Sequence, residues 1–292
     1  MDKHSTSAEK GTYISIAAYI FLSALKLSFG YFGDSKGLWA DGLNNTTDII
    51  ASMAVLIGLK ISKRPPDDNH SYGHLRVETV ASLVAAFIMV TVGLQVIFSA
   101  VKSFFNQDST TVPNMLTAYV AIFSAIFMYG IYRYNLALSK KINSASIYAV
   151  AQDNRSDALV SIGASIGIIG TKVGIFWLDA IAALVVGIII CKTAWDIFRD
   201  ASISLTDGFD EQLLQQIGQT ILLTEGVKNM SEIKARMHGS EILLEATVHV
   251  NPLLTVIQSH DITVKIEENL LNEYNIQYVI VHIEPYIFPK KR

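Results

Sequence analysis

Two pairs of oxygen-bearing side chains interrupt apolar stretches of the chain at the same spacing. Asp41 and Asn45 are four residues apart in LWADGLNNTTDIIASM, and Asp153 and Asp157 are four apart in AVAQDNRSDALVSIG. On a helix, this spacing places both members of a pair on one face. Two such helices packed face to face would bring three carboxylates and one amide oxygen to the same depth. Oxygen ligands favour manganese, magnesium or calcium over zinc and copper, so these residues predict a divalent cation site.

Ionisable side chains cost free energy in apolar surroundings, so the presence of these two pairs indicates a function. The alternative is that they only make interhelical hydrogen bonds, but two matched pairs exceed what packing requires. Carboxylates that close repel, so a site without metal would hold at least one proton, and an arriving cation would displace it. We expect Asp48 to support the ligands or the helix packing from outside the site. Arg155 is expected to pair with a carboxylate or to extend towards the membrane surface.

A second candidate site lies in the segment PPDDNHSYGH. His70 and His74 are four residues apart, and Asp67 precedes His70 by three. Two imidazoles and a carboxylate form an ordinary ligand set for zinc or manganese. The alternative is a solvated loop without a metal.

A third candidate group is near the end of the chain. His282 and Glu284 are two apart in an alternating segment, so on a strand they share a face. A neighbouring strand could add His249, and His260 begins a predicted helix. Scattered histidines are usually ordinary surface or core residues, so both interpretations stay open.

The elements that must position these residues begin with six apolar stretches. The chain is 51% hydrophobic and only 17% charged, against roughly 25% charged in a typical soluble domain. About 20 apolar residues cross a bilayer as a helix. The second and fifth stretches carry the polar pairs, which lowers their hydropathy. The predicted membrane spans are residues 12–32, 38–60, 77–101, 114–134, 145–170 and 176–197.

Basic residues gather in the second and fourth connections between these spans, which predicts that both termini are cytoplasmic. Because the start of the chain is polar, we expect no cleavable signal peptide. The single cysteine, Cys191, excludes a disulfide framework within one chain, and the net charge of −3 gives no reason to expect nucleic acid. No nucleophile, phosphate loop or cofactor motif is present, so we expect a carrier and no enzyme.

The character of the chain changes at residue 205. Residues 209–224 and 259–274 have helical spacing of apolar residues, whereas 241–252 and 277–285 alternate like strands, and 227–239 reads as strand and turn. The order αββαβ predicts a small α+β domain of the ferredoxin-like kind, with its helices on one face of the sheet. We therefore expect a six-helix transmembrane domain over 1–204 and a cytoplasmic metal-binding domain over 205–292.

Four motifs of the chain resemble those of the cation diffusion facilitators, bacterial efflux proteins for zinc, iron and manganese. They are ADGLNNTTD, DDNHSYGH, DNRSDA and VIVHIEP, and the resemblance covers nearly the whole chain. It implies three sets of metal ligands: a transport site at Asp41, Asn45, Asp153 and Asp157; a loop site at Asp67, His70 and His74; and a binuclear cytoplasmic site at His249, His260, His282 and Glu284.

The resemblance also points to departures and to a partner. At the position of one metal-binding histidine of the family, this chain has Ser231. The binuclear site therefore lacks one ligand unless the nearby His238 replaces it. Zinc-transporting relatives carry histidine and aspartate where this chain has Asp153 and Asn45, so the chain is similar to the manganese branch. The family also implies a homodimer, interlocked by a charged pair at Arg76 and Asp207.

Together these features predict a manganese exporter of a bacterial-type cell membrane that exchanges the metal for protons. Zinc, iron and cobalt are the other candidate cations. Two alternatives are a zinc or iron carrier of the same fold and a membrane-anchored metal sensor that does not transport. A carrier of organic solutes lacks any apolar pocket signature.

Overall fold

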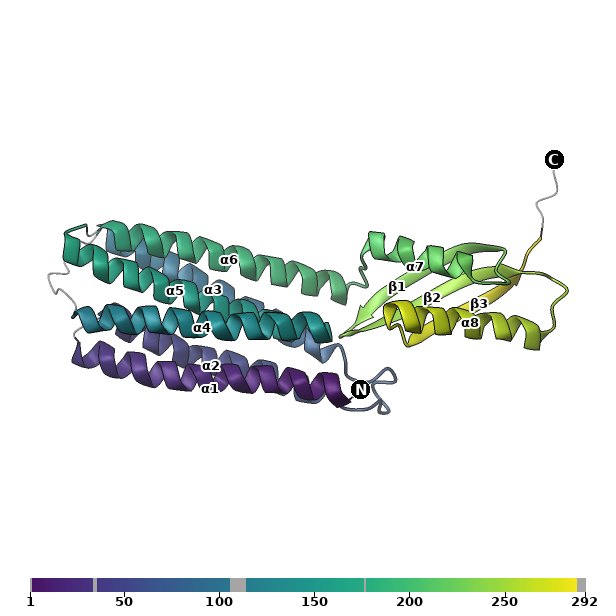
Figure 1. Ribbon diagram of the computed structural model, residues 1–292, viewed down its shortest axis with the longest axis horizontal. Helices are drawn as coiled ribbons and strands as arrows, with labels where there is room; N and C mark the ends of the chain where they lie inside the picture. The colour runs from purple at the N-terminus through teal and green to yellow at the C-terminus, as the bar shows by residue number, and fades with distance from the viewer. Residues whose placement is uncertain (1, 34–35, 106–113, 176, 288–292) are drawn as a thin grey trace. The chain divides into compact units, whose positions relative to one another are not determined.

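A computed structural model describes residues 2–33, 36–105, 114–175 and 177–287, and the chain divides into two compact units, 1–201 and 202–292 (Figure 1). Each of the six predicted apolar stretches corresponds to a helix, and residue 176, the first of the sixth stretch, lies outside the described residues. The helices are α1 (Asp2–Phe32), α2 (Lys36–Ser62), α3 (Val77–Phe105), α4 (Met115–Ile142), α5 (Ala145–Val173) and α6 (Trp177–Leu205).

Small side chains let the helices of unit 1 approach closely. Ala85, Ala86, Ala149 and Ala194 are buried in one core cluster, which joins α3, α5 and α6. Between α3 and α6, a Cβ added at Gly93 would lie 2.7 Å from the sulfur of Cys191. Helices inside membranes associate through such small residues, because lipid supplies no hydrophobic driving force between them.

The start of α5 is fixed by its own cap. Asn143 ends α4 in the left-handed conformation, with φ of 51°. Ser144 follows, and its Oγ accepts a hydrogen bond from the backbone N of Ile147 at 3.2 Å. The same hydroxyl donates to Glu78 in the first turn of α3. These contacts set the position of α5, the helix that carries Asp153 and Asp157.

Among the residues that the structure describes, length and composition mark three helices as able to cross a membrane by themselves: Ser7–Phe32, Val77–Lys102 and Met115–Ile142. Polar residues lower the hydropathy of α2 and α5, as the sequence predicts. Both helices nevertheless expose large apolar side chains, including Ile50 and Ile57 on α2 and Ile162 and Ile166 on α5.

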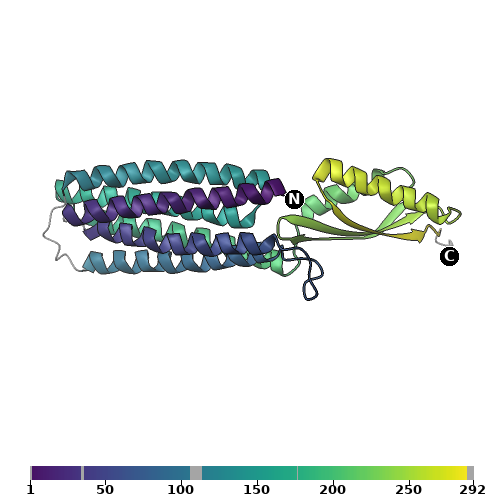
Figure 2. The ribbon, with the colours of Figure 1, turned by 90° about the horizontal axis from the view of Figure 1, so that it is seen from below.

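Unit 2 contains the predicted αββαβ order: α7 (Glu211–Leu223), β1 (Asn229–His238), β2 (Glu241–Val250), α8 (Val256–Tyr274) and β3 (Tyr278–Pro285). The sheet order is β1-β2-β3, with β1 antiparallel and β3 parallel to the central β2. Both helices cover one face of the sheet (Figure 2).

Alternating side chains of β2 form the core of unit 2. Leu244, Ala246, Val248 and Val250 are buried and pack in one cluster with residues of α7 and α8, among them the fully buried Ile266. The intervening residues of β2, including His249, point to the opposite face.

This core yields a prediction for stability. Ile266→Ala removes a fully buried side chain and should destabilise unit 2 by about 2–5 kcal/mol. Ile257→Ala, the same substitution at an exposed position of α8, should change stability by at most about 0.5 kcal/mol. Hydrogen exchange of the β2 amides in the full-length protein measures both; equal protection in the two variants would contradict the assigned core.

Candidate metal centre

Three carboxylates meet inside unit 1, from α2 and α5. One carboxylate oxygen from each of Asp48, Asp153 and Asp157 lies within 4.8 Å of the other two. Asp48 and Asp157 are buried, and Asp153 is partly buried. Oxygens at this separation can converge on one cation, and an all-carboxylate set suits a hard divalent ion.

Two amides hold Asp48 in this position. The Nδ2 groups of Asn44 and Asn45 donate to Asp48 Oδ2 at 3.2 and 3.3 Å. The side-chain oxygen of Asn45, Oδ1, is buried and has no hydrogen-bond partner within the described parts of the chain, and the same is true of Asp157 Oδ2. Buried oxygens without partners are costly, so these atoms mark places where a cation would be stabilising.

Asp41 lies elsewhere, although the sequence analysis places it among the ligands and Asp48 outside them. Its Oδ2 is 2.8 Å from the Nζ of Lys26 on α1, and both side chains are almost completely buried. Asp41 and Asp48 are seven residues apart and thus share a helix face, so spacing alone could not choose between them. The choice depends on Lys26, which comes from another helix.

A chain of hydrogen bonds leads from the carboxylates to α1 and α4. The hydroxyl of Tyr19 donates to Asp153 Oδ2 at 2.8 Å and accepts from Asn154 Nδ2 at 2.9 Å. Asn154 Oδ1 accepts in turn from Ser15 and Asn135 at 3.0 and 2.9 Å. These residues are not among those predicted from the sequence, where they differ from their neighbours only as polar side chains inside apolar stretches.

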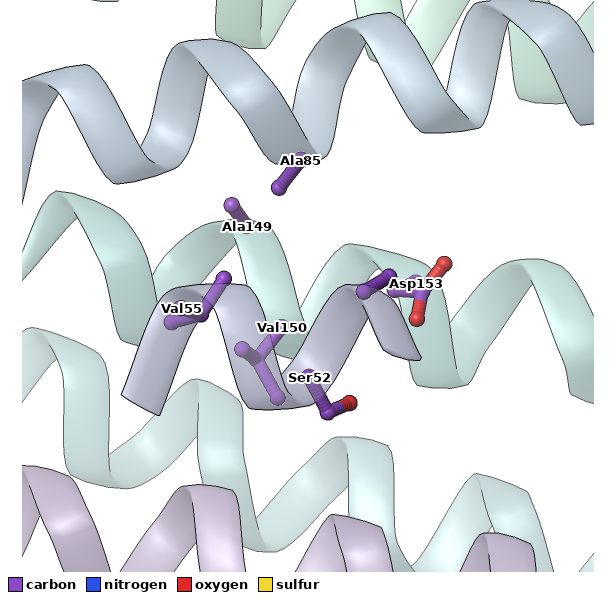
Figure 3. A pocket seen from close by; sticks show the side chains of 7 residues that line it. Ser52, Val55, Ala85, Ala149, Val150 and Asp153 are labelled. Atoms are coloured by element: carbon purple, nitrogen blue, oxygen red, sulfur yellow. The ribbon is translucent and has the colours of Figure 1, made fainter. Parts of the chain in front are cut away.

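A small pocket adjoins Asp153 (Figure 3). Its lining is apolar apart from Asp153 and Ser52, and it comes from three helices. The lining residues are Ala51, Ser52 and Val55 of α2, Ala85 of α3, and Ala149, Val150 and Asp153 of α5. Along α2 the pocket extends from the carboxylates towards the α2–α3 connection. Arg155 does not take part: its guanidinium donates to Gln152 at 3.4 Å.

The loop residues form a second group. One ligand atom from each of Asp67, His70 and His74 lies within 4.8 Å of the other two. His70 Nδ1 is 3.0 Å from Asp67 Oδ1, and His74 Nε2 is 3.5 Å from Asp67 Oδ2. The hydrogen bond from His70 holds the pKa of Asp67 below its ordinary value. The structure therefore assembles the predicted loop triad around one carboxylate.

The cytoplasmic candidates are less closely grouped. His249 faces Glu284 across β2 and β3, with 3.8 Å between Nε2 and Oε2, and His282 Nε2 is 3.9 Å from Glu284 Oε1. Within the described ranges these three form no group as tight as the other two. His260 contacts Thr263 on its own helix.

Several further predicted residues have assigned positions in unit 2. Ser231 falls where the pairing of β1 with β2 shifts register between Met230 and Glu232. His238, the proposed substitute, is the buried last residue of β1. Asp207 forms an ion pair with Arg236 at 3.5 Å. Its interlock with Arg76 of a second chain stays a prediction.

Comparison with known proteins decides the family. Residues 12–206 match the family model of the cation efflux transmembrane domain, and residues 209–286 match that of the cation efflux protein cytoplasmic domain. The chain belongs to the cation efflux family. The resemblance to the cation diffusion facilitators is thereby confirmed.

Members of this cation efflux family from Bacillus subtilis align along almost the whole chain. The manganese efflux system protein MneS is 51% identical over 277 residues, which cover 95% of each chain. The uncharacterized transporter YdbO is 47% identical over the same length, with 95% of each chain covered. The manganese efflux system protein MneP is 31% identical over 288 residues, or 96% of each.

The three-carboxylate cluster can be tested by binding. Asp48→Asn should lower manganese affinity by at least about tenfold, or about 1.4 kcal/mol, because it removes a charged ligand. Asp196→Asn, an exposed position on α6, should leave affinity unchanged. Both are compared in protein carrying His70→Ala and His282→Ala, so that the other candidate sites do not contribute. Equal affinities would place the cation away from Asp48.

The loop triad predicts a pH dependence. Asp67 stays ionised in mild acid because its pKa is lowered, so a loss of metal there must come from protons that compete with the metal for the imidazole nitrogens. The wild type should therefore bind more zinc than His70→Ala in neutral solution, and this difference should disappear on mild acidification. Equilibrium dialysis measures this difference, and a difference that persists at the lower pH would contradict imidazole ligation.

Proposed function

We propose that the chain is a manganese efflux carrier that exchanges the metal for protons. The observation that carries this proposal is the group of Asp48, Asp153 and Asp157, buried between two helices of a cation efflux protein. An all-oxygen set agrees with manganese, and the names of MneS and MneP support the same cargo.

The surface of unit 1 supports the proposed membrane arrangement. All of its helices expose large apolar side chains; on α6, Trp195 and Ile188 are more than half exposed. Apolar side chains on the outside and carboxylates on the inside suit a bilayer. We infer six spans in a cell membrane with both termini cytoplasmic, because the basic residues favour the second and fourth connections.

The carrier works by alternating access. A cation enters from the end of the bundle that carries the α2–α3 connection, which is the side of the carboxylates where the pocket beside Asp153 lies. The carboxylate oxygens of Asp48, Asp153 and Asp157 bind this cation, and the side-chain amide oxygen of Asn45 is available as a further ligand. Three neighbouring carboxylates repel and hold protons when no cation is present, so the metal displaces protons on entry. Protons from the opposite side then compete the metal off.

The cytoplasmic unit and the loop supply regulation in this proposal. Two copies of the chain associate through unit 2, and the name of the family model that matches this unit, ZT_dimer, supports such an association. Metal at Asp67, His70 and His74, and at His249, His260, His282 and Glu284, favours the associated form. His249 and Glu284 need only small side-chain movements to share an ion, because they are already paired in register.

Flux measurements in proteoliposomes test the function. With a pH dye inside, we expect manganese to move in one direction and protons in the other. Asp157→Ala should abolish both movements, whereas Asp196→Ala, at an exposed acidic position of α6, should retain them. Zinc, iron and cobalt are measured in parallel.

The outcomes separate the competing functions. Zinc flux without manganese flux would keep the carrier and overturn the cargo. Folded wild-type protein that binds metals but moves none would point to a sensor. Asp153→His should shift preference towards zinc if the ligand types set selectivity, since zinc gains more than manganese from imidazole.

A further inference from the structure

The buried ion pair of Lys26 and Asp41 takes no part in the carboxylate cluster and has no assigned role. Lys26 Nζ lies 2.8 Å from Asp41 Oδ2 and donates to Ser161 Oγ at 3.0 Å. Ser161 Oγ also donates to Asp41 Oδ2 at 3.2 Å. The three residues come from α1, α2 and α5, and the Lys26 side chain is completely buried.

Stability alone does not explain such a pair. Desolvation of two charges commonly offsets their attraction, and apolar replacements of buried pairs are often neutral or stabilising. Within a membrane the cost is greater, and ionisable residues there ordinarily serve transport or pairing. The pair therefore calls for a function in the path of the ion.

The position of the pair along the helices suggests that function. Asp41 precedes Asp48 by seven residues, or about 10 Å along α2, and Ser161 follows Asp157 by one turn, about 6 Å along α5. The pocket beside Asp153 extends from the cluster in the opposite direction. Lys26 and Asp41 thus lie on the side of the cluster away from the pocket, at the next charged level towards the end where α1 meets α2.

Unpartnered oxygens lie at and between the two levels. Asp41 Oδ1, Asn45 Oδ1 and Asp157 Oδ2 are buried without hydrogen-bond partners within the described ranges. Asp41 and Asn45 are one turn apart on α2, so a cation leaving the cluster in this direction would meet another carboxylate. An unpaired Asp41 would offer that cation a second binding place.

We propose that Lys26 is a tethered cation that neutralises Asp41 and so keeps it from becoming a second manganese site. The inference rests on the proposed transport function. The ammonium occupies the position that a departing metal ion would otherwise fill. Manganese then binds only at the three-carboxylate cluster and leaves without being retained at Asp41.

Counting bound manganese tests the proposal. Lys26→Met removes the charge, and protein purified in detergent should bind an additional manganese ion per chain relative to wild type. Efflux from proteoliposomes should slow several-fold, because the ion is retained on its way out. Adding Asp41→Asn to Lys26→Met should abolish the additional ion and restore the rate, whereas Lys26→Arg should bind no additional ion. A purely structural role for Lys26 would leave the ion count unchanged in every variant.

Two results would overturn the proposal: a Lys26→Met protein that binds no additional manganese, or a double variant that still binds it.

If Lys26→Met does not fold, Asp41→Asn alone supplies the test. That variant leaves the ammonium without its partner, and its contact with Ser161 holds it one helical turn from Asp157, so manganese affinity at the cluster should fall several-fold. Wild-type affinity in Asp41→Asn would contradict the role. Wild-type liposomes that move no manganese would sink the transport function instead, while the ion count still decides on Lys26.

Discussion

Mutual repulsion among three buried carboxylates is the constraint on which the rest of unit 1 depends. Asp48, Asp153 and Asp157 approach within 4.8 Å where water is scarce, and only positive charge or protons can relieve them. The surrounding polar groups orient the carboxylates but do not neutralise their charge. Asn44 and Asn45 orient Asp48, and Tyr19 orients Asp153. Under the proposed transport function, the remaining deficit of positive charge would let the site take up a divalent ion and give it back.

The helices that carry this charge are held by two kinds of contact. Small residues bring backbones together in the core, whereas hydrogen bonds among Ser15, Asn135 and Asn154 join α1, α4 and α5 beside the site. Hydrogen-bonded side chains cannot slide past one another as apolar ones can. The polar network therefore restricts the relative movement of α1, α4 and α5 next to Asp153.

Much of this architecture could be predicted from local patterns. The six apolar stretches, the αββαβ order and the loop triad each depend on residues close together in sequence. What the sequence could not decide was which of Asp41 and Asp48 joins the cluster, because seven-residue spacing puts both on one face of α2. The answer lies in Lys26 and Tyr19, which arrive from α1 and whose partners are set by tertiary packing. Strand register likewise had to be seen before His249 could be paired with Glu284.

The close approach of α3 and α6 has a practical consequence. Gly93 leaves space for the sulfur of Cys191, and no other cysteine occurs in the chain. The protein thus carries a single natural attachment point, located where two helices touch. A thiol reagent applied during the transport cycle would react only with Cys191 at the contact between α3 and α6. The rate of that reaction would show whether the two helices separate during the cycle or move together.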